Sequence, residues 1–297
     1  MRKAALILLL IFCLLTGTAL GEKASRRVFF ASEVEPFAQG AETFDLYVCP
    51  LLGADCMILT CGGETMLVDM GKAKDYPIIQ EQLAALGIDH IDIAFNTHPH
   101  TDHLGSMRQI LADYPVGRFM TAFPETYTGN DVIQIPVLKA IRTAEVPVVT
   151  VADGDAFTLG GAQMTVIRQT KYGMPNPLSC MLKIQYGSCT ILLTADVIGS
   201  AQKYLAETHD LKADIMKMPH HGLNQVAREF LAAIDPEYAF FTHGYANTKQ
   251  AQAQLDRNGI PHDYATWGVI HLSTDGAAWI VEQALNENGV IYNQKYR

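Results

Sequence analysis

The segment from His98 to His103 gathers four metal-competent side chains within six positions. His98 and His100 are two residues apart on a stretch that we expect to be extended, so both imidazoles point to the same side. Pro99 fixes its own φ and favours an extended conformation at His98, which stiffens the pair. Asp102 and His103 follow at the turn into a helix and face a second point beside the first. Three imidazoles and a carboxylate suit Zn²⁺ or a similar ion, so the segment predicts a metal site.

Further acidic and imidazole side chains stand where other strands are expected to end. In α/β proteins, ligands bind at the carboxyl ends of the strands. The residues that directly follow apolar runs are Asp69, Asp196, His220, His221 and His243. On the same edge as the 98–103 segment, they would extend the metal site. Each could instead be an ordinary loop or helix-capping residue. For His243, a loop histidine with satisfied hydrogen bonds and a residue that reaches the substrate are both open.

The elements that must position these residues alternate between strands and helices. We expect strands at 44–49, 56–60, 65–69, 91–96, 118–122, 163–167, 180–185, 190–194, 214–218, 238–242, 269–272 and 278–281. We expect helices at 76–86, 103–114, 132–143, 198–207 and 225–234. No low-complexity tract, long linker or fixed-period repeat interrupts them, so residues 41–297 are predicted to form one domain. Strand pairs mixed with strand–helix units favour an α/β fold in which two sheets lie between helical layers.

Residues 1–21 have the three regions of a secretory signal peptide. Arg2 and Lys3 precede an apolar stretch at 4–15, and the small residues Ala19 and Gly21 frame a cleavage site. The apolar stretch is shorter than the roughly 20 residues that span a bilayer. We therefore expect a secreted or extracytoplasmic chain without stable membrane insertion after cleavage. An uncleaved N-terminal membrane anchor is the alternative. Residues 22–40 are expected to be a loosely attached lead-in.

Composition, charge and cysteine content limit the classes of protein and partner. With 49% hydrophobic and 18% charged residues, a disordered chain is excluded. Loss of residues 1–21 would leave 20 cationic and 31 acidic residues, a net charge of −11. Such a surface repels polyanions, which disfavours nucleic acid as a partner without excluding it. Five cysteines follow residue 21. This odd number leaves at least one unpaired, and the sequence does not give the connectivity.

The motifs together resemble the metallo-β-lactamase superfamily, which is characterised by HxHxDH, a later aspartate after an apolar strand and a later histidine turn. The finer likeness is to the hydrolase domain of competence DNA-uptake proteins, and the same features are similar to those of phosphorylcholine esterases. The motifs that carry it are LVDMG at 67–71, NPLSCML at 176–182, ILLTAD at 191–196 and KMPHHG at 217–222. The resemblance implies a four-layer αββα sandwich, the metallo-β-lactamase fold.

The resemblance also implies roles for individual residues. His98 and His100 would hold a first metal, Asp102 and His103 a second, and Asp196 would bridge them. Either His220 or His221 would complete the second site, and we favour His220 because the rigid Pro219 precedes it. Asp69 would orient the HxHxDH loop from outside the ligand set. The chain departs from the family in having no histidine between residues 104 and 195, where Asn176 and Ser179 stand instead. The first metal would therefore be weakly held or absent.

These features predict an exported metal-dependent hydrolase of a phosphoester or phosphodiester. Two ions, Zn²⁺ or alternatively Mn²⁺, would activate a water as hydroxide. The catalytic side chains would be Asp102, the His220–His221 pair and His243, with the histidine that is not a ligand assisting the leaving group. The substrate would be a small phosphoester or a phosphodiester such as DNA. The alternatives are a lactonase or other C–O hydrolase, and a catalytically silent metal-binding surface module.

Overall fold

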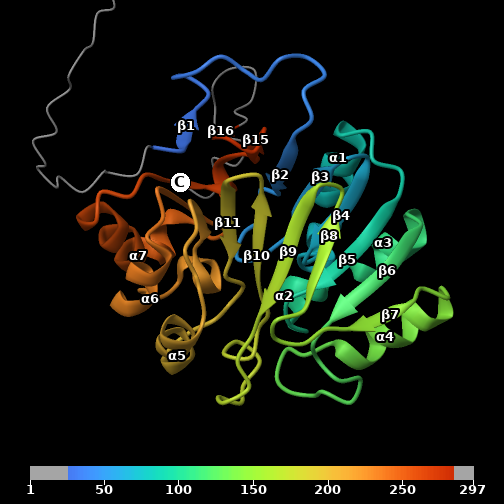
Figure 1. Ribbon diagram of the computed structural model, residues 1–297. Coiled ribbons are helices and arrows are strands. Elements are labelled where there is room, and N and C mark those ends of the chain that lie inside the picture. The colour runs from blue at the N-terminus through green and yellow to red at the C-terminus, as the bar shows by residue number, and fades with distance from the viewer. Residues whose placement is uncertain (1–25, 284–297) are drawn as a thin grey trace, which may run out of the picture.

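Two mixed sheets face each other within residues 26–283, the part of the chain that this computed structural model describes (Figure 1). The larger sheet has the strand order β1 (Val28–Phe30), β16 (Trp279–Gln283), β15 (Ile270–Thr274), β2 (Phe44–Val48), β3 (Met57–Cys61), β4 (Glu64–Val68), β5 (Ile91–Asn96), β6 (Val116–Thr121) and β7 (Val148–Thr150). The smaller sheet has the order β14 (His262–Tyr264), β13 (Tyr238–Phe241), β12 (Ile215–Lys217), β11 (Cys189–Leu193), β10 (Met181–Tyr186), β9 (Ala162–Ile167) and β8 (Ala156–Leu159).

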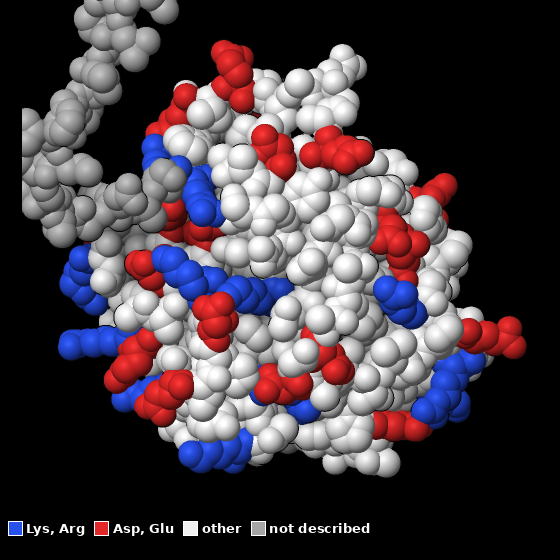
Figure 2. Space-filling model, viewed as in Figure 1, with Lys and Arg blue, Asp and Glu red and all other residues white. Residues whose placement is uncertain are grey.

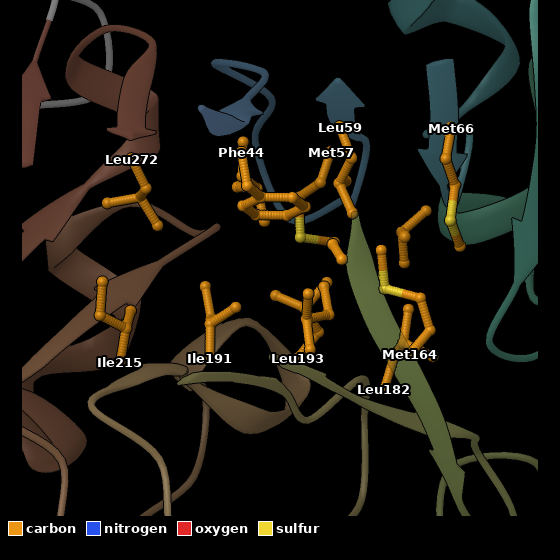
Figure 3. Packing of buried hydrophobic residues seen from close by; sticks show 14 of the residues in the cluster. Phe44, Met57, Leu59, Met66, Met164, Leu182, Ile191, Leu193, Ile215 and Leu272 are labelled. Carbon is orange, nitrogen blue, oxygen red and sulfur yellow. The ribbon is translucent and has the colours of Figure 1, made fainter. Parts of the chain in front are cut away.

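A layer of apolar side chains fills the space between the two sheets. Figure 3 shows Met57, Leu59 and Met66 of the larger sheet facing side chains of the smaller sheet such as Ile191 and Leu193. In β2, buried and half-buried residues alternate, which is the pattern of a strand with one face in the core. Burial of apolar surface at about 25 cal/mol per Å² is the main force that holds the two sheets together.

Helices cover the outer face of each sheet and complete four layers. On the larger sheet these helices are α1 (Tyr76–Ala85), α3 (Met107–Asp113) and α4 (Gln134–Thr143). On the smaller sheet they are α5 (Ser200–Thr208), α6 (Arg228–Ile234) and α7 (Tyr245–Arg257). Short helical turns link the layers at α2 (Thr101–Leu104), η1 (Ala73–Asp75), η2 (Pro219–Gly222) and η3 (Ala265–Trp267). The predicted α/β class and the αββα sandwich are confirmed.

The structure differs from the expected elements at several places. The short strands β7, β8 and β14, each three or four residues long, were not among those that we expected. The helix expected at 103–114 is two helices, α2 and α3, separated at Gly105. A Cβ at Gly105 would lie 2.6 Å from the Ala73 nitrogen, so the close approach of these segments needs glycine. The sequence missed α7, because only four of its thirteen residues are buried and its apolar periodicity is weak. Within the lead-in, Val28–Phe30 pairs in parallel with β16 and so belongs to the larger sheet.

Two predictions about the N-terminal part of the chain concern residues that the structure does not describe. The signal peptide expected at 1–21 lies outside the described residues, as do residues 22–25 of the lead-in. Between residues 26 and 283, none of the helices has the length and apolar character needed to cross a bilayer.

Candidate metal centre

The carboxyl ends of five strands meet at one edge of the two sheets. Strands β4 and β5 run parallel in the larger sheet, and β11, β12 and β13 run parallel in the smaller one. Each of these strands is followed by residues that the sequence singled out, so their side chains lie around one place. The residues are Asp69 after β4, the 98–103 segment after β5, Asp196 after β11, His220 and His221 after β12, and His243 after β13.

Four ligand atoms surround one position at this edge. The Nε2 atoms of His103 and His221 lie 3.3 Å and 3.5 Å from Asp196 Oδ2. The same two nitrogens lie 3.9 Å and 3.5 Å from the carboxylate of Asp102. Ligands of a tetrahedral ion with bonds of about 2.1 Å are separated by about 3.4 Å. The four side chains are therefore spaced as the ligands of one small cation would be.

A second position lies beside the first and uses the same aspartate. His98 Nε2 is 3.1 Å from His100 Nδ1 and 3.8 Å from Asp196 Oδ2. Two imidazole nitrogens and a carboxylate oxygen thus converge next to the four-ligand position. Because Asp196 Oδ2 borders both groups, one carboxylate would bridge two ions.

Unsatisfied buried atoms show that this pocket fits cations. His103 Nε2, His221 Nε2 and Asp196 Oδ1 are buried and have no hydrogen-bond partner among the described residues. A buried polar atom left without a partner costs about 1–3 kcal/mol, so a native protein rarely leaves three together. Ligation of divalent ions would satisfy these atoms, and nitrogen and oxygen donors in this mixture suit Zn²⁺. The donor set fits the two metals that the sequence predicts.

Asp69 contacts the Nδ1 edge of the His103 ring, on the opposite side from the candidate ligand atom Nε2. Its Oδ2 lies 2.7 Å from His103 Nδ1, which makes Nδ1 the protonated nitrogen and leaves the Nε2 lone pair for a ligand. The same carboxylate accepts the Thr97 N–H at 2.8 Å and the Thr97 hydroxyl at 2.7 Å. The structure therefore places Asp69 where we expected a residue that orients the HxHxDH loop.

Asp55 orients His221 as Asp69 orients His103, and it was not among the residues that we expected at the site. Asp55 Oδ1 lies 2.9 Å from His221 Nδ1 and accepts the Thr242 hydroxyl at 2.6 Å. Lys217 Nζ lies 2.6 Å from Asp55 Oδ2, and both side chains are fully buried. Lys217 also donates to the carbonyl of Ala195, the residue before Asp196. The signal in the sequence was an aspartate and a lysine inside otherwise apolar runs.

Asp55 is an orienting residue rather than a ligand, although it belongs to a compact buried group with His103, Asp196 and His221. Its carboxylate faces the Nδ1 edges of the two rings, at 2.9 Å from His221 and 3.8 Å from His103. Asp102 instead faces the Nε2 edges, where an ion would sit. The ring edge that each carboxylate faces separates the two roles.

The buried carboxylates determine the protonation of the histidines in the metal-free protein. Burial opposes a charge on His221, but Asp196 and Asp55 outweigh it and raise the pKa of His221 to about 9. Burial likewise opposes a charge on His103, and Asp196 and Asp69 raise its pKa well above the usual value. Burial lowers the pKa of His98 far below the usual value, so His98 is neutral. The pocket thus attracts positive charge, which bound cations would supply in place of protons.

The geometry goes against our preference for His220 as the ligand. His221 is buried and points into the centre, whereas His220 is half-buried and its Nδ1 hydrogen-bonds to Asn224 Oδ1 at 2.8 Å. Strand alternation does not apply here, because β12 ends at Lys217 and both histidines have positive φ, 49° and 56°.

His243 packs beside the metal centre on the loop that carries Asp55. A Cβ at Gly53 would lie 2.7 Å from the His243 ring, so the absence of a side chain at Gly53 makes room for the imidazole. His243 Nδ1 accepts the Gly244 N–H at 2.8 Å. Burial lowers the pKa of His243, and the neighbouring positive charges of His221 and Lys72 lower it further.

The loop between β9 and β10 carries the residues that stand in place of the missing family histidine. Cys180 N–H donates to the Thr97 carbonyl at 3.0 Å, which joins this loop to the segment that leads into His98. Ser179 Oγ donates to the Asn176 carbonyl at 2.5 Å, so this hydroxyl holds the loop itself. Asn176 Oδ1 is buried without a partner among the described residues. A role for either residue at the first metal stays a prediction.

A surface cavity of about 690 Å³ lies elsewhere, between α6 and α7, where residues such as Arg228, Asp235 and Arg257 line it. None of the site histidines lines it. The candidate site is therefore identified by its buried nitrogen and oxygen atoms without hydrogen-bond partners and not by the volume of a cavity.

Comparisons with known proteins agree with this geometry. A family model described as the metallo-beta-lactamase superfamily matches residues 49–243. The chain is 26% identical over 187 residues to the competence protein ComA of Neisseria gonorrhoeae, an alignment that covers 61% of this chain and 24% of ComA. The chain thus spans about a quarter of the length of the curated relative that it matches.

Solved structures support the fold. CmlA, a diiron beta-hydroxylase from Streptomyces venezuelae, has a TM-score of 0.52 at 14% identity, over 79% of this chain and 54% of CmlA. A mutant of CmlA gives the same TM-score at 15% identity and the same coverage. At this level of identity the likeness concerns the arrangement of the elements alone.

Proposed function

The chain belongs to the metallo-β-lactamase superfamily, and from this premise we propose that it is an exported hydrolase of phosphoester or phosphodiester bonds. The observation that carries the proposal is the placement of two adjacent ligand groups around Asp196 Oδ2, which lies 3.3 Å from His103 and 3.8 Å from His98. Paired divalent cations are a common device for phosphoryl transfer to water. Zn²⁺ is the cation that we propose, with Mn²⁺ as the alternative.

The chain's own side chains hold the reactants in place. Bound there, a pair of cations supplies a water that loses its proton near neutral pH and neutralises charge on phosphoryl oxygens. Asp69 and Asp55 fix the ring orientation of His103 and His221, so that both Nε2 atoms are ready to bind. Asp102 is partly exposed on the open side of the centre, where it would accept a hydrogen bond from the attacking water.

Two further histidines have opposite hydrogen-bonding roles. His220 Nδ1 donates to Asn224 Oδ1, which leaves the lone pair of its Nε2 as an acceptor. His243 Nδ1 accepts the Gly244 N–H, so its Nε2 carries the proton. In this arrangement His243 would donate a hydrogen bond to a phosphoryl or leaving-group oxygen, and His220 would accept one from the substrate or from water.

The surroundings of the centre favour a small organic phosphoester over a nucleic acid. Leu223 and Tyr245 come directly after the two histidine turns, and both side chains are more than a third exposed. Such side chains cover the organic part of a small substrate. Figure 2 shows acidic and basic residues interspersed over one face of the molecule, without a continuous basic stripe. A DNA strand would need such a stripe, since phosphate contacts dominate its affinity.

A substrate panel tests the proposal. The purified protein, loaded with Zn²⁺ or Mn²⁺, is assayed on bis-p-nitrophenyl phosphate, p-nitrophenyl phosphorylcholine, single-stranded DNA and nitrocefin. We expect turnover of the first two substrates, with the small phosphoester preferred over DNA. The Asp196→Ala variant is the control for contaminating hydrolases. Cleavage of nitrocefin alone, or no turnover in a protein that binds two metals, would contradict the proposal.

A further inference from the structure

Cys49 and Cys56 stand directly opposite each other on the hairpin of β2 and β3. The register pairs Val48 with Met57, and one step further the Cys49 N–H donates to the Cys56 carbonyl at 3.0 Å. Opposite residues of an antiparallel pair point to the same face, with Cα atoms about 4.5–5.5 Å apart. Disulfides join cysteines whose Cα atoms are about 4.4–6.8 Å apart. The backbone therefore provides the separation that a disulfide needs.

The side chains also meet, and they lie apart from the other cysteines. The Cys49 side chain is the neighbour that raises the pKa of the Cys56 thiol most, and each residue is 1% exposed. Both belong to the apolar layer between the larger sheet and its helices. The other cysteines of residues 26–283 are Cys61, Cys180 and Cys189, and all three belong to the layer between the two sheets. The larger sheet thus separates one pair from the remaining three.

The loop that these two cysteines enclose supports the metal centre. Gly53 N–H donates to the Thr242 carbonyl at 2.9 Å, and Asp55 N–H donates to the Asp102 carbonyl at 3.1 Å. Lys72 Nζ donates to the carbonyls of Leu52 and Gly53 at 3.0 Å and 2.6 Å. Through Asp55, the loop also orients His221. A bond across its base would limit the conformations of the loop before any metal binds.

We propose that Cys49 and Cys56 form a disulfide that closes the 50–55 loop beside the metal centre. The oxidant would be a disulfide donor, either glutathione disulfide or an oxidised thiol–disulfide oxidoreductase. Each cysteine loses one proton, an Sγ–Sγ bond forms, and the disulfide of the donor is reduced to two thiols. Contact with Cys49 and burial raise the pKa of the Cys56 thiol. Because exchange needs a thiolate, the bond would form while the chain folds rather than afterwards.

Peptide mapping tests the disulfide directly. The full chain is refolded in a glutathione redox buffer, alkylated in denaturant without reductant and digested with trypsin. One peptide, 28–72, carries Cys49, Cys56 and Cys61, whereas Cys180 and Cys189 fall on peptides 172–183 and 184–203. We expect a single alkyl group on peptide 28–72, placed on Cys61, and a mass about 2 Da lower at the other two sulfurs. Alkylation of all three cysteines, or a bond that involves Cys61, would overturn the proposal.

Two variants and a second measurement sharpen the test. Cys49→Ser should give two alkyl groups on peptide 28–72, and the matched control Cys61→Ser should give none. The alkyl groups are counted in denaturant, so burial of a free thiol does not hide it from the reagent. In the metal-free wild type, reduction should speed hydrogen exchange at the amides of Gly53 and Asp55 while leaving the hairpin of β10 and β11 unchanged. Equal exchange in the two redox states would overturn the effect on the loop.

Discussion

Lys217 and Asp55 form a fully buried ion pair, with 2.6 Å between Nζ and Oδ2, behind the metal centre. The pair joins two sheets, because Lys217 ends β12 and Asp55 precedes β3. Burial would raise the pKa of Asp55, but the charges of Lys217 and His221 keep it below its usual value, so the carboxylate is ionised. An ionised Asp55 accepts a hydrogen bond from the Nδ1–H of His221, which leaves Nε2 free to bind the ion that we propose.

Removal of one partner of this pair should destabilise the protein strongly. Lys217→Met leaves the Asp55 charge buried and unpaired, and Asp55→Asn does the same to Lys217, at a cost of about 3–5 kcal/mol each. The double variant should lose much less than the sum of the two. Urea unfolding of the three variants measures the coupling. The exposed pair Lys212–Asp235 is the control, where a coupling of at most about 1 kcal/mol is expected. Additive losses at Lys217 and Asp55 would contradict the interpretation.

Asp196→Ala should release bound metal and stop turnover while the fold remains. Asp196 Oδ2 borders both ligand groups, so its loss removes a ligand from each ion. Metal content by mass spectrometry, circular dichroism and the rate on the phosphoester substrates measure the three effects. Asp256→Ala, which changes an exposed carboxylate on α7, should leave all three unchanged. Full metal content in the Asp196→Ala variant would contradict the bridging role that we propose for Asp196.

Substitutions of the two adjacent histidines, His220 and His221, should have different effects on metal occupancy and on rate. His221→Ala should lower metal occupancy, because a four-ligand site that loses an imidazole binds far more weakly. His220→Ala should keep the metal and slow the chemical step, by about 10²–10⁴ if the side chain transfers a proton. Metal content and rate are measured for each variant. If His220→Ala loses the metal and His221→Ala keeps it, the geometry of this turn is wrong.

The metal-free protein should lose stability as the pH rises from about 6.5 to 9. The pKa of His221 is raised from 6.5 to about 9 in the folded protein, so protonation stabilises the fold fully below pH 6.5. This stabilisation disappears as the pH passes the folded pKa, at a cost of about 3 kcal/mol. Urea unfolding after chelation, at several pH values, checks this prediction. The metal-loaded protein should not show the change, because an ion replaces the proton. Identical profiles with and without metal would argue against it.

Export predicts a mature chain that begins near Glu22. The prediction rests on the three regions of residues 1–21. Intact-mass measurement of the protein recovered outside the cytoplasm gives the first residue. A protein that still carries Met1 to Gly21 would favour the membrane-anchored alternative.

The sequence alone was enough to predict the fold class and most of the candidate metal ligands. The HxHxDH segment is local, so its spacing and the conformational restriction by Pro99 could be read from adjacent residues. Asp69 and Asp196 end apolar strands and were found by position. Twelve of the sixteen strands of residues 26–283 were predicted to within a few residues, because burial of one or both faces leaves a clear periodic pattern. The short strands β1, β7, β8 and β14 were missed. Polar α7 lacked such a pattern and was missed.

Only the tertiary structure showed which distant residues orient the histidines of the centre and which histidine faces the metal position. Asp55 and His221 are 166 residues apart, and Lys217 reaches Asp55 from the other sheet. His221 turns inward in a turn where both histidines have positive φ, and the rigidity of Pro219, on which we based our preference, pointed to the wrong histidine. The facing of Cys49 and Cys56 likewise needed the register of β2 and β3. Residue types and short spacings specify what chemistry a chain can perform, whereas orientation arises from contacts between segments that meet only when the chain is folded.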